Sequence, residues 1–324
     1  MDVVKMWNLE TERVIKEIEK RNAKRILFQI PEGLKRDVEK EIEKIKEYFN
    51  KKGKSLELMI WGGTCFGGCD LVDGEVGHLG IDLIIHYGHE ELEYAKPSIP
   101  TIFVPVYHIF DEKEKNGILN DIKDIIKEKN ISTVATTIQY KELLKRYNPT
   151  IVLGCRAEIN KEGNILFVGT GRFHPLMIAY KIKKPVIIYN PVTGEVSSIE
   201  EEEINKLIKR RIAVISKLMI NPPKKIGIVL STKKGQCRKK VLEYVKNLLK
   251  NAKIDYLLIV VNNLSPQSLI YDVDAYVIVA CPRIVMDDYA LYDKPILTPK
   301  ELEMLINGEF EYVFDEIKKE DFEG

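Results

Sequence analysis

The chain has 324 residues, of which 45% are hydrophobic and 31% charged. This composition is typical of a globular protein and excludes a disordered, collagen-like or coiled-coil chain. At about 150 residues per domain, the length predicts two domains or three small ones. The 50 Lys and Arg residues against 49 Asp and Glu leave a net charge of +1. No global positive field therefore exists to bind nucleic acid by phosphate neutralisation.

The sequence indicates a cytoplasmic protein that binds no membrane. No apolar run approaches the roughly 18 residues of a membrane span. Acidic residues lie near the N-terminus, where a signal peptide would have an apolar core. The five cysteines are an odd number, which argues against a disulfide framework and for metal or redox chemistry.

Short apolar segments alternate with helical ones in chain order, and they fall into three sets of four expected strands. The first set is 26–30, 56–61, 83–87 and 101–104; the second is 133–137, 151–154, 166–169 and 186–189; the third is 226–230, 256–261, 276–279 and 296–297. Strands separated by helices are typical of parallel α/β units with right-handed crossovers.

The three sets indicate an internal repeat. Each ends on a proline-marked strand, and the first and third also share an Asp ahead of an apolar strand, Asp82 and Asp274. We therefore expect an α/β fold of three related small domains, each a parallel four-stranded sheet with flanking helices, arranged around a central metal site. The expected domains are 1–110, 111–195 and 196–324, and a helix at about 199–219 bridges the second and third.

The cysteines follow expected strands. Cys65 and Cys69 come after the second strand of the first repeat, Cys155 after the second strand of the second, and Cys281 after the third strand of the third. Ligand sites of open α/β sheets gather at the carboxyl ends of the strands. If the repeats face one axis, one cysteine from each can converge, and three thiolates select an iron–sulfur cluster or zinc. The alternative is that these cysteines are small buried hydrophobes.

The cysteine spacing does not match the C-x3-C-x2-C motif of ordinary radical S-adenosylmethionine enzymes. Cys65 and Cys69 supply the first interval, but position 72 is Val72. Cys237 lies at the start of a helix in the third repeat, and we interpret it as incidental.

Several motifs resemble those of the diphthamide-biosynthesis enzymes, the archaeal 2-(3-amino-3-carboxypropyl)histidine synthase family. They are QIPEGL at 29–34, FGGCD at 66–70, GIDLIIHYGH at 80–89, VLGC at 152–155 and ACPR at 280–283. The motifs extend through all three repeats, and HYGH together with ACPR is the specific part.

The resemblance implies three related α/β domains, each giving one cysteine to a [4Fe-4S] cluster. It implies that S-adenosylmethionine is cleaved to a 3-amino-3-carboxypropyl radical and methylthioadenosine, and that the radical adds to a histidine of translation elongation factor 2. The implied partners are elongation factor 2, an electron donor and a second copy of the chain in a homodimer. Carried over residue by residue, the cluster ligands are Cys69, Cys155 and Cys281, while Cys65 stands where relatives have another small residue.

Two further residues are expected to bind S-adenosylmethionine. The Arg283 guanidinium could pair with the carboxylate of the cofactor in a bidentate fork; the alternative is a salt bridge to Asp287. His89 lies at the carboxyl end of an expected strand and is the better site residue of the HYGH pair, because His86 can be a core residue. No catalytic residue is assigned.

Two other functions stay open at the level of the residues. One is a dehydratase such as quinolinate synthase, which also joins three α/β domains around a three-cysteine cluster. The other is a non-catalytic partner subunit or structural zinc module, although structural zinc usually takes four protein ligands. The nature of the bound metal separates these functions.

Overall fold

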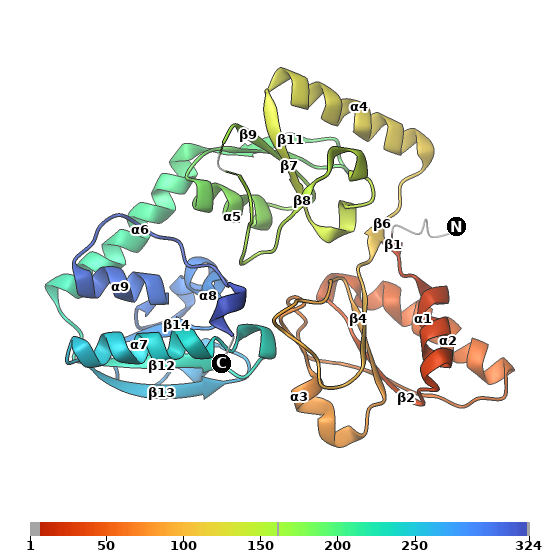
Figure 1. The fold of residues 1–324 in the computed structure, drawn as a ribbon, viewed down its shortest axis with the longest axis horizontal. Coiled ribbons are helices and arrows are strands. Elements are labelled where there is room, and N and C mark those ends of the chain that lie inside the picture. The colour runs from red at the N-terminus through yellow and green to blue at the C-terminus, as the bar shows by residue number, and fades with distance from the viewer. Residues whose placement is uncertain (1–6, 161, 323–324) are drawn as a thin grey trace. The chain divides into compact units, whose positions relative to one another are not determined.

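The structure is a computed structural model that describes residues 7–160 and 162–322 (Figure 1). The helices are α1 (Thr11–Arg21), α2 (Lys35–Lys51), α3 (Asp73–Val76), α4 (Glu112–Glu128), α5 (Phe173–Ile182), α6 (Glu201–Ile220), α7 (Lys239–Asn251), α8 (Pro282–Asp287) and α9 (Pro299–Asn307). The strands are β1 (Trp7–Asn8), β2 (Arg25–Gln29), β3 (Glu57–Ile60), β4 (Leu83–Tyr87), β5 (Thr101–Val104), β6 (Tyr107–His108), β7 (Ile131–Thr136), β8 (Thr150–Ile151), β9 (Asn164–Val168), β10 (Val186–Tyr189), β11 (Val196–Ile199), β12 (Lys225–Ser231), β13 (Asp255–Val261), β14 (Ala275–Val279) and β15 (Ile296–Leu297). Over these two described ranges, no helix combines the length and the apolar character that a membrane crossing needs.

The chain divides into two compact units. The first comprises Met1–Gly117 with two short segments from later in the chain, Ile138–Lys145 and Lys233–Gly235. The second comprises Ile118–Thr137, Arg146–Thr232 and Gln236–Gly324. The division into three domains at residues 110 and 195 stays a prediction.

The first unit contains a parallel four-stranded sheet in the order β3-β2-β4-β5. Successive side chains of a strand point to opposite faces, so β2 contributes to two cores. Phe28 packs with α1 and α2 on one face, whereas Leu27 packs with Val72 and Val76 on the other. The buried face of α2 is the one that the apolar spacing predicts, namely Val38, Ile42, Ile45 and Phe49.

The second unit contains two sheets, and the first of them differs from expectation. Its order is β11-β10-β9-β7-β8, and β11 is antiparallel to β10. The chain reverses after β10 in a turn where Asn190 N donates to Glu195 O at 2.9 Å and Gly194 has φ of 72°. The sheet therefore has a fifth strand, β11, in a segment where the sequence analysis predicted no strand and which it placed at the start of the third repeat. The strand predicted at 151–154 is shorter and ends at Ile151 as β8.

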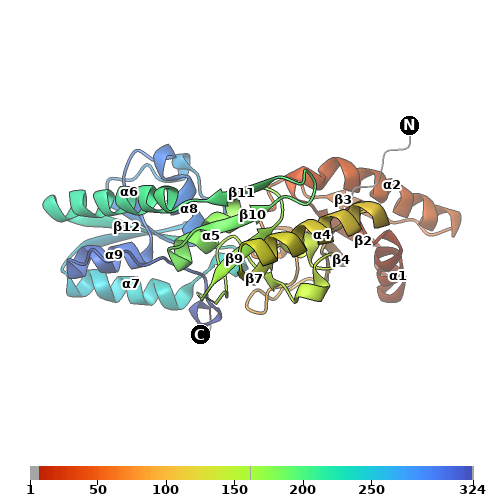
Figure 2. The ribbon, with the colours of Figure 1, turned by 90° about the horizontal axis from the view of Figure 1, so that it is seen from above.

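The other sheet of the second unit is parallel throughout, in the order β13-β12-β14-β15. Figures 1 and 2 show α7 and α9 running alongside it, and these helices pack on one face with Ile228 and Val277. Helix α6 contributes Ile204 to the core of the five-stranded sheet and Ile215 to the core of this one. The opposite face of the sheet carries a second core, which includes Val229 and Ile278, as expected for a parallel sheet.

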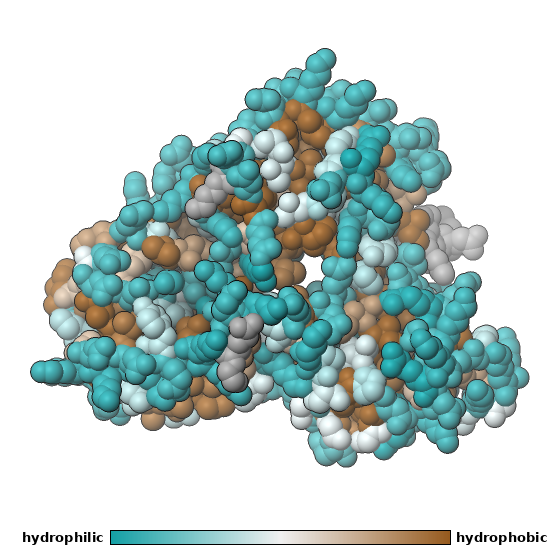
Figure 3. Space-filling view, viewed as in Figure 1, coloured by the Kyte–Doolittle hydropathy of each residue, from teal (hydrophilic) through white to brown (hydrophobic). Residues whose placement is uncertain are grey.

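β13 is an edge strand with exposed apolar side chains. Tyr256, Leu258 and Val260 are all exposed, and Ile270 of the following loop is 83% exposed. Figure 3 shows hydrophobic surface along this edge of the molecule, below the hydrophilic side chains of α7. An exposed apolar edge is a surface suited to pairing with another chain.

The Asp shared by the first and third repeats has one structural role in both. Asp82 Oδ2 accepts hydrogen bonds from the backbone N–H groups of Lys24 and Arg25, both at 2.8 Å. Asp274 Oδ2 accepts from Lys224 and Lys225 at 2.7 and 2.9 Å. In each sheet, the carboxylate ahead of the third strand therefore fixes the start of the first strand. The fold class of parallel α/β sheets flanked by helices is confirmed.

Candidate functional site

Cys69 lies in a tight turn after β3, in the first unit. Asp70 N donates to Gly67 O at 3.0 Å and closes the turn around the cysteine. Gly68 has no room for a side chain, because a Cβ there would lie 2.5 Å from the carbonyl oxygen of Glu90. Gly68 of the FGGCD motif therefore allows the chain to fold tightly at Cys69, whose side chain is half-buried.

The segment Lys233–Gly235, which follows β12 in the chain, packs on this turn as part of the first unit. The Lys233 ammonium forms an ion pair with Asp70, and both side chains are almost fully buried, at 5% and 2% exposure. Lys234 Nζ lies 2.6 Å from Asp73 Oδ2. Burial alone would raise the pKa of Asp73, but its hydrogen bonds with Lys234 and Ser98 lower it.

Gly235 makes the closest approach to the cysteine. Its backbone N–H donates to Cys69 O at 3.2 Å. A Cβ at position 235 would lie 2.4 Å from Cys69 Cα and 2.5 Å from its Cβ, which is too close for any side chain. These atoms are backbone or next to it and cannot move aside. A glycine at 235 is therefore a condition for the observed position of Cys69.

Cys155 lies in a buried turn after β8, in the second unit. The turn is closed by Leu153 N, which donates to Arg156 O at 3.0 Å. The C-terminal segment packs against this turn. Ile317 N donates to Cys155 O at 3.4 Å, and Lys181 pairs with Glu316 at 2.9 Å.

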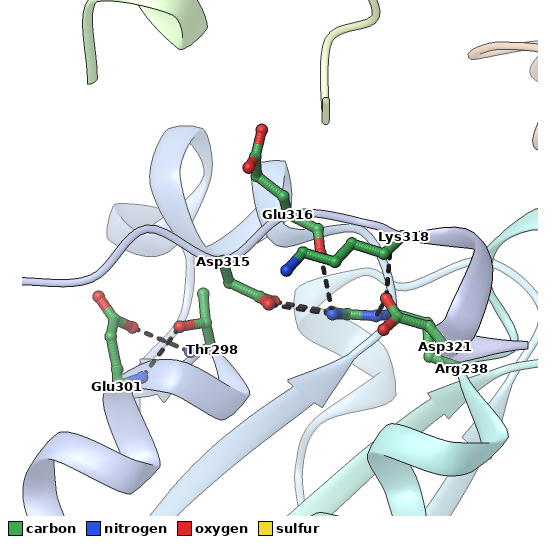
Figure 4. A network of polar contacts seen from close by, with 7 residues as sticks. All are labelled: Arg238, Thr298, Glu301, Asp315, Glu316, Lys318 and Asp321. Atoms are coloured by element: carbon green, nitrogen blue, oxygen red, sulfur yellow. Dashed lines mark hydrogen bonds and ion pairs between the residues drawn. The ribbon is translucent and has the colours of Figure 1, made fainter. Parts of the chain in front are cut away.

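A buried arginine fixes that C-terminal segment. Arg238 bonds both oxygens of Asp315 at 2.7 and 2.9 Å, and its Nε donates to Asp321 at 2.8 Å (Figure 4). Figure 4 also shows the capping box of α9, in which Thr298 and Glu301 bond each other's backbone N–H. The segment that supports Cys155 is thus tied to the start of α7.

Phe173 connects the loops of Cys155 and Cys281 within the second unit. Its ring lies against Gly154, where a Cβ would be 2.0 Å from the nearest ring carbon. The Arg283 guanidinium lies over the same ring, 3.8 Å from its centroid. One aromatic ring therefore packs between the residue before Cys155 and a residue two positions after Cys281.

Cys281 follows β14 and is the N-cap residue of α8, with a proline in the first turn. Arg283 Nη2 pairs with Asp287 at 2.7 Å, so the salt bridge that the sequence left as an alternative is present. The Nε and Nη1 atoms of Arg283 are buried and have no hydrogen-bond partner within the described residues. Buried donors of this kind are rare and suit an anionic ligand.

His86 and His89 lie side by side in the first unit. His86 Nε2 is 3.0 Å from His89 Nδ1 and 3.8 Å from Cys65 Sγ, while His86 Nδ1 is 3.0 Å from Gln29 Oε1. Burial lowers the pKa of both histidines, that of His89 to about 4, so both are neutral at physiological pH. The contact of His89 with S-adenosylmethionine stays a prediction.

The structure brings some of the predicted site residues together. Gly154, which precedes Cys155, and Arg283, two residues after Cys281, both contact Phe173 in the second unit. Cys69 belongs to the first unit, so the convergence of the three cysteines stays a prediction. Sequence reasoning missed Lys233, Gly235 and Phe173 as site residues. One sequence signal for Lys233 and Gly235 was available. The KKG loop follows the first strand of the third repeat and so corresponds to the IPEG loop of the first repeat.

Comparisons with known proteins agree over almost the whole chain. A family model for diphthamide synthesis proteins matches residues 30–317. The 2-(3-amino-3-carboxypropyl)histidine synthase of Methanocaldococcus jannaschii is 59% identical, over 99% of this chain and 96% of that protein. The synthase of Pyrococcus horikoshii is 35% identical, over 94% and 92%. The crystal structure of Dph2 from Pyrococcus horikoshii with a 4Fe-4S cluster has a TM-score of 0.80 and 34% identity, over 96% of this chain and 94% of that one.

Proposed function

Because this chain belongs to the diphthamide synthesis protein family, we propose that it transfers the 3-amino-3-carboxypropyl group of S-adenosylmethionine to a histidine of translation elongation factor 2. This is the first step of diphthamide biosynthesis. The observation that carries the proposal is the 59% identity to a 2-(3-amino-3-carboxypropyl)histidine synthase over 99% of the chain. The cofactor is a [4Fe-4S] cluster, as in the similar crystal structure.

We assign the cluster ligands to Cys69, Cys155 and Cys281. None of the three forms a disulfide with another described residue, each follows a strand, and thiolates are the ligands that iron–sulfur clusters require. Held by three thiolates, such a cluster supplies one electron and one open iron position to S-adenosylmethionine. The chain contributes the positions of its thiolates, which Gly235 and Phe173 support through the contacts described above.

Arg283 is the residue proposed to hold the cofactor carboxylate. Two of its N–H-bearing atoms are buried without a partner in the described part of the chain. Stacking on Phe173 and pairing with Asp287 fix the plane of the guanidinium. A carboxylate that meets a fixed, desolvated guanidinium forms charge-assisted hydrogen bonds and is oriented by them.

The proposal includes partners and a compartment. Elongation factor 2 is the protein substrate, an electron donor reduces the cluster, and the chain acts in the cytoplasm as a homodimer. The exposed apolar edge along β13 supports self-association. A net charge of +1 means that capture of the protein substrate rests on shape and local charge pairs and not on a global field.

Product analysis tests the function. Anaerobically purified, chemically reduced protein is incubated with S-adenosylmethionine and elongation factor 2. We expect methylthioadenosine and an elongation factor 2 that gains the mass of one aminocarboxypropyl group. An elongation factor 2 whose acceptor histidine is changed to Ala should gain no mass, while methylthioadenosine still forms.

Three outcomes would contradict the proposal. 5′-Deoxyadenosine as the main product would refute the assigned bond cleavage. Mass gain without the acceptor histidine would refute the assigned acceptor. An intact, reducible cluster that yields neither nucleoside would favour a dehydratase or a non-catalytic partner.

A further inference from the structure

Cys65, His86 and His89 form a compact cluster in the first unit, and none of them is among the proposed ligands of the iron–sulfur cluster. Cys65 Sγ lies 3.8 Å from His86 Nε2, and this nitrogen lies 3.0 Å from His89 Nδ1. One ligand atom from each residue lies within 4.8 Å of the other two. Cys65 and His86 are buried, at 6% and 0% exposure.

We propose that Cys65, His86 and His89 bind Zn²⁺ or a chemically similar divalent cation. With Zn–S bonds of about 2.3 Å and Zn–N bonds of about 2.0–2.1 Å, a tetrahedral ion separates two nitrogens by about 3.4 Å and a sulfur from a nitrogen by about 3.6 Å. The distances from His86 Nε2 to His89 Nδ1 and to Cys65 Sγ differ from these by less than about half an ångström, and the third pair of ligand atoms lies within 4.8 Å. Small rotations of the side chains would therefore admit the ion.

Gln29 orients His86 for this purpose. Its side-chain amide donates to the carbonyl oxygen of Asp70, so its Oε1 faces His86 Nδ1 at 3.0 Å. A carbonyl oxygen accepts only, and His86 Nδ1 must therefore carry the proton. The lone pair of the neutral ring is left on Nε2, which faces Cys65 and His89. A hydrogen bond that fixes the tautomer in this way is a usual companion of a metal-bound histidine.

The ligand types select the class of metal. One thiolate and two imidazoles suit zinc, cobalt and similar ions, whereas Mg²⁺ and Ca²⁺ prefer oxygen ligands. Three protein ligands leave a fourth position for water or another small ligand.

The location gives the ion a structural role. Cys65 lies in the segment that leads to Cys69, while His86 and His89 lie at the carboxyl end of β4. The ion would therefore join the segment carrying Cys69 to the sheet. Gln29 adds a second link between the same parts, because it bonds both His86 and the backbone of Asp70.

Cobalt titration tests the site. The full-length chain is used with Cys69, Cys155 and Cys281 all changed to Ala, so that the proposed cluster ligands cannot bind the probe. We expect one Co²⁺ per chain, with thiolate-to-cobalt charge-transfer absorption that disappears when Cys65→Ala is added. Gln29→Leu should weaken binding by about ten- to a hundredfold. Cys237→Ala and His78→Gln, which change a half-buried thiol and an exposed histidine outside the cluster, should leave binding unchanged.

The proposal fails if the parent chain, in which Cys69, Cys155 and Cys281 are changed to Ala, binds no stoichiometric Co²⁺. It also fails if the charge-transfer absorption persists after Cys65→Ala is added to that chain. If the Cys65→Ala chain does not fold, thermal unfolding of the parent chain tests the proposal instead. A bound ion stabilises the native state, so Zn²⁺ should raise the unfolding temperature of the parent chain, and an unchanged temperature would overturn the proposal. In the protein with intact cysteines, we expect one zinc per chain in addition to the iron.

Discussion

Gly235 is the residue whose size most directly controls the position of Cys69. An added methyl group would meet the Cα and Cβ of Cys69 at 2.4 and 2.5 Å. Overpacking of this kind costs about 1–3 kcal/mol, and here the strain acts on a proposed cluster ligand. We predict that Gly235→Ala lowers both the free energy of unfolding and the iron content per chain, measured by urea unfolding and metal analysis.

Gly117→Ala is the matched control for this prediction. Gly117 lies in α4, and a Cβ there would meet no atom within 4 Å. Alanine is the better helix former by about 1 kcal/mol, so this variant should be at least as stable as the wild type and keep its iron. Normal iron content in the Gly235→Ala chain would show that the contact does not position the ligand.

Arg283 offers a prediction about cofactor binding. If its two unpartnered N–H atoms meet the carboxylate of S-adenosylmethionine, then Arg283→Gln removes hydrogen bonds to a charged group worth about 1.5–3 kcal/mol. The KM for S-adenosylmethionine should rise by about ten- to a hundredfold, with the cluster absorbance unchanged. Initial rates of methylthioadenosine formation at varied cofactor concentration measure this effect.

Asp287→Asn separates this role from the salt bridge. It removes the charge that pairs with Arg283 Nη2 at 2.7 Å but leaves the guanidinium itself. Its effect on KM should be several-fold smaller. Equal effects of the two variants would indicate that Arg283 only holds α8 in place.

At the scale of elements, Asp82 and Asp274 each fix the first strand of a sheet. Hydrogen bonds from two backbone N–H groups lower the pKa of each carboxyl group. A lowered pKa gives stability that is complete above the unfolded-state value of about 3.9 and is lost as the pH falls through the folded value. We predict that Asp82→Ala and Asp274→Ala each cost about 1 kcal/mol at pH 7, because both carboxylates are exposed.

The pH dependence is the sharper part of this prediction. Below the folded pKa of these groups, the wild type has lost the same interaction, so the difference between wild type and variant should shrink towards acidic pH. Urea unfolding at a series of pH values measures it. A difference that stays constant, or grows, as the pH falls would contradict a role for the charged carboxylate.

Much of the element pattern could be predicted because it is local. The apolar spacing of α2 and the short runs that form β4, β5 and β10 are contained in a few consecutive residues. β11 was missed because its sequence, VSSI, has little apolar character and pairs only through a turn after β10. β8 is short because the segment after it turns to form the buried loop of Cys155.

The site was only partly predictable, for a different reason. Cysteines at strand ends follow from the order of elements along the chain, so Cys69, Cys155 and Cys281 could be named. The contacts of Gly235 with Cys69, and of Phe173 with Gly154 and Arg283, join segments far apart in sequence. No local pattern encodes such contacts.

At the scale of the whole molecule, the proposed function requires one cysteine from each of the three large sheets to bind a single cluster. Cys69 follows a strand of the β3-β2-β4-β5 sheet, Cys155 follows β8, and Cys281 follows β14. If the three thiolates bind one cluster, removing any of them leaves only two protein ligands. We therefore expect the same loss of iron whichever of the three cysteines is removed.

The iron and sulfide content of single cysteine variants, purified anaerobically and read with their visible absorption and EPR spectra, tests this most directly. Cys69→Ala, Cys155→Ala and Cys281→Ala should each lose most of the iron and the thiolate-to-iron charge-transfer absorption. Cys237→Ala, a matched half-buried cysteine, should keep about four iron atoms per chain. A Cys155→Ala chain with its full complement of iron would contradict the shared cluster.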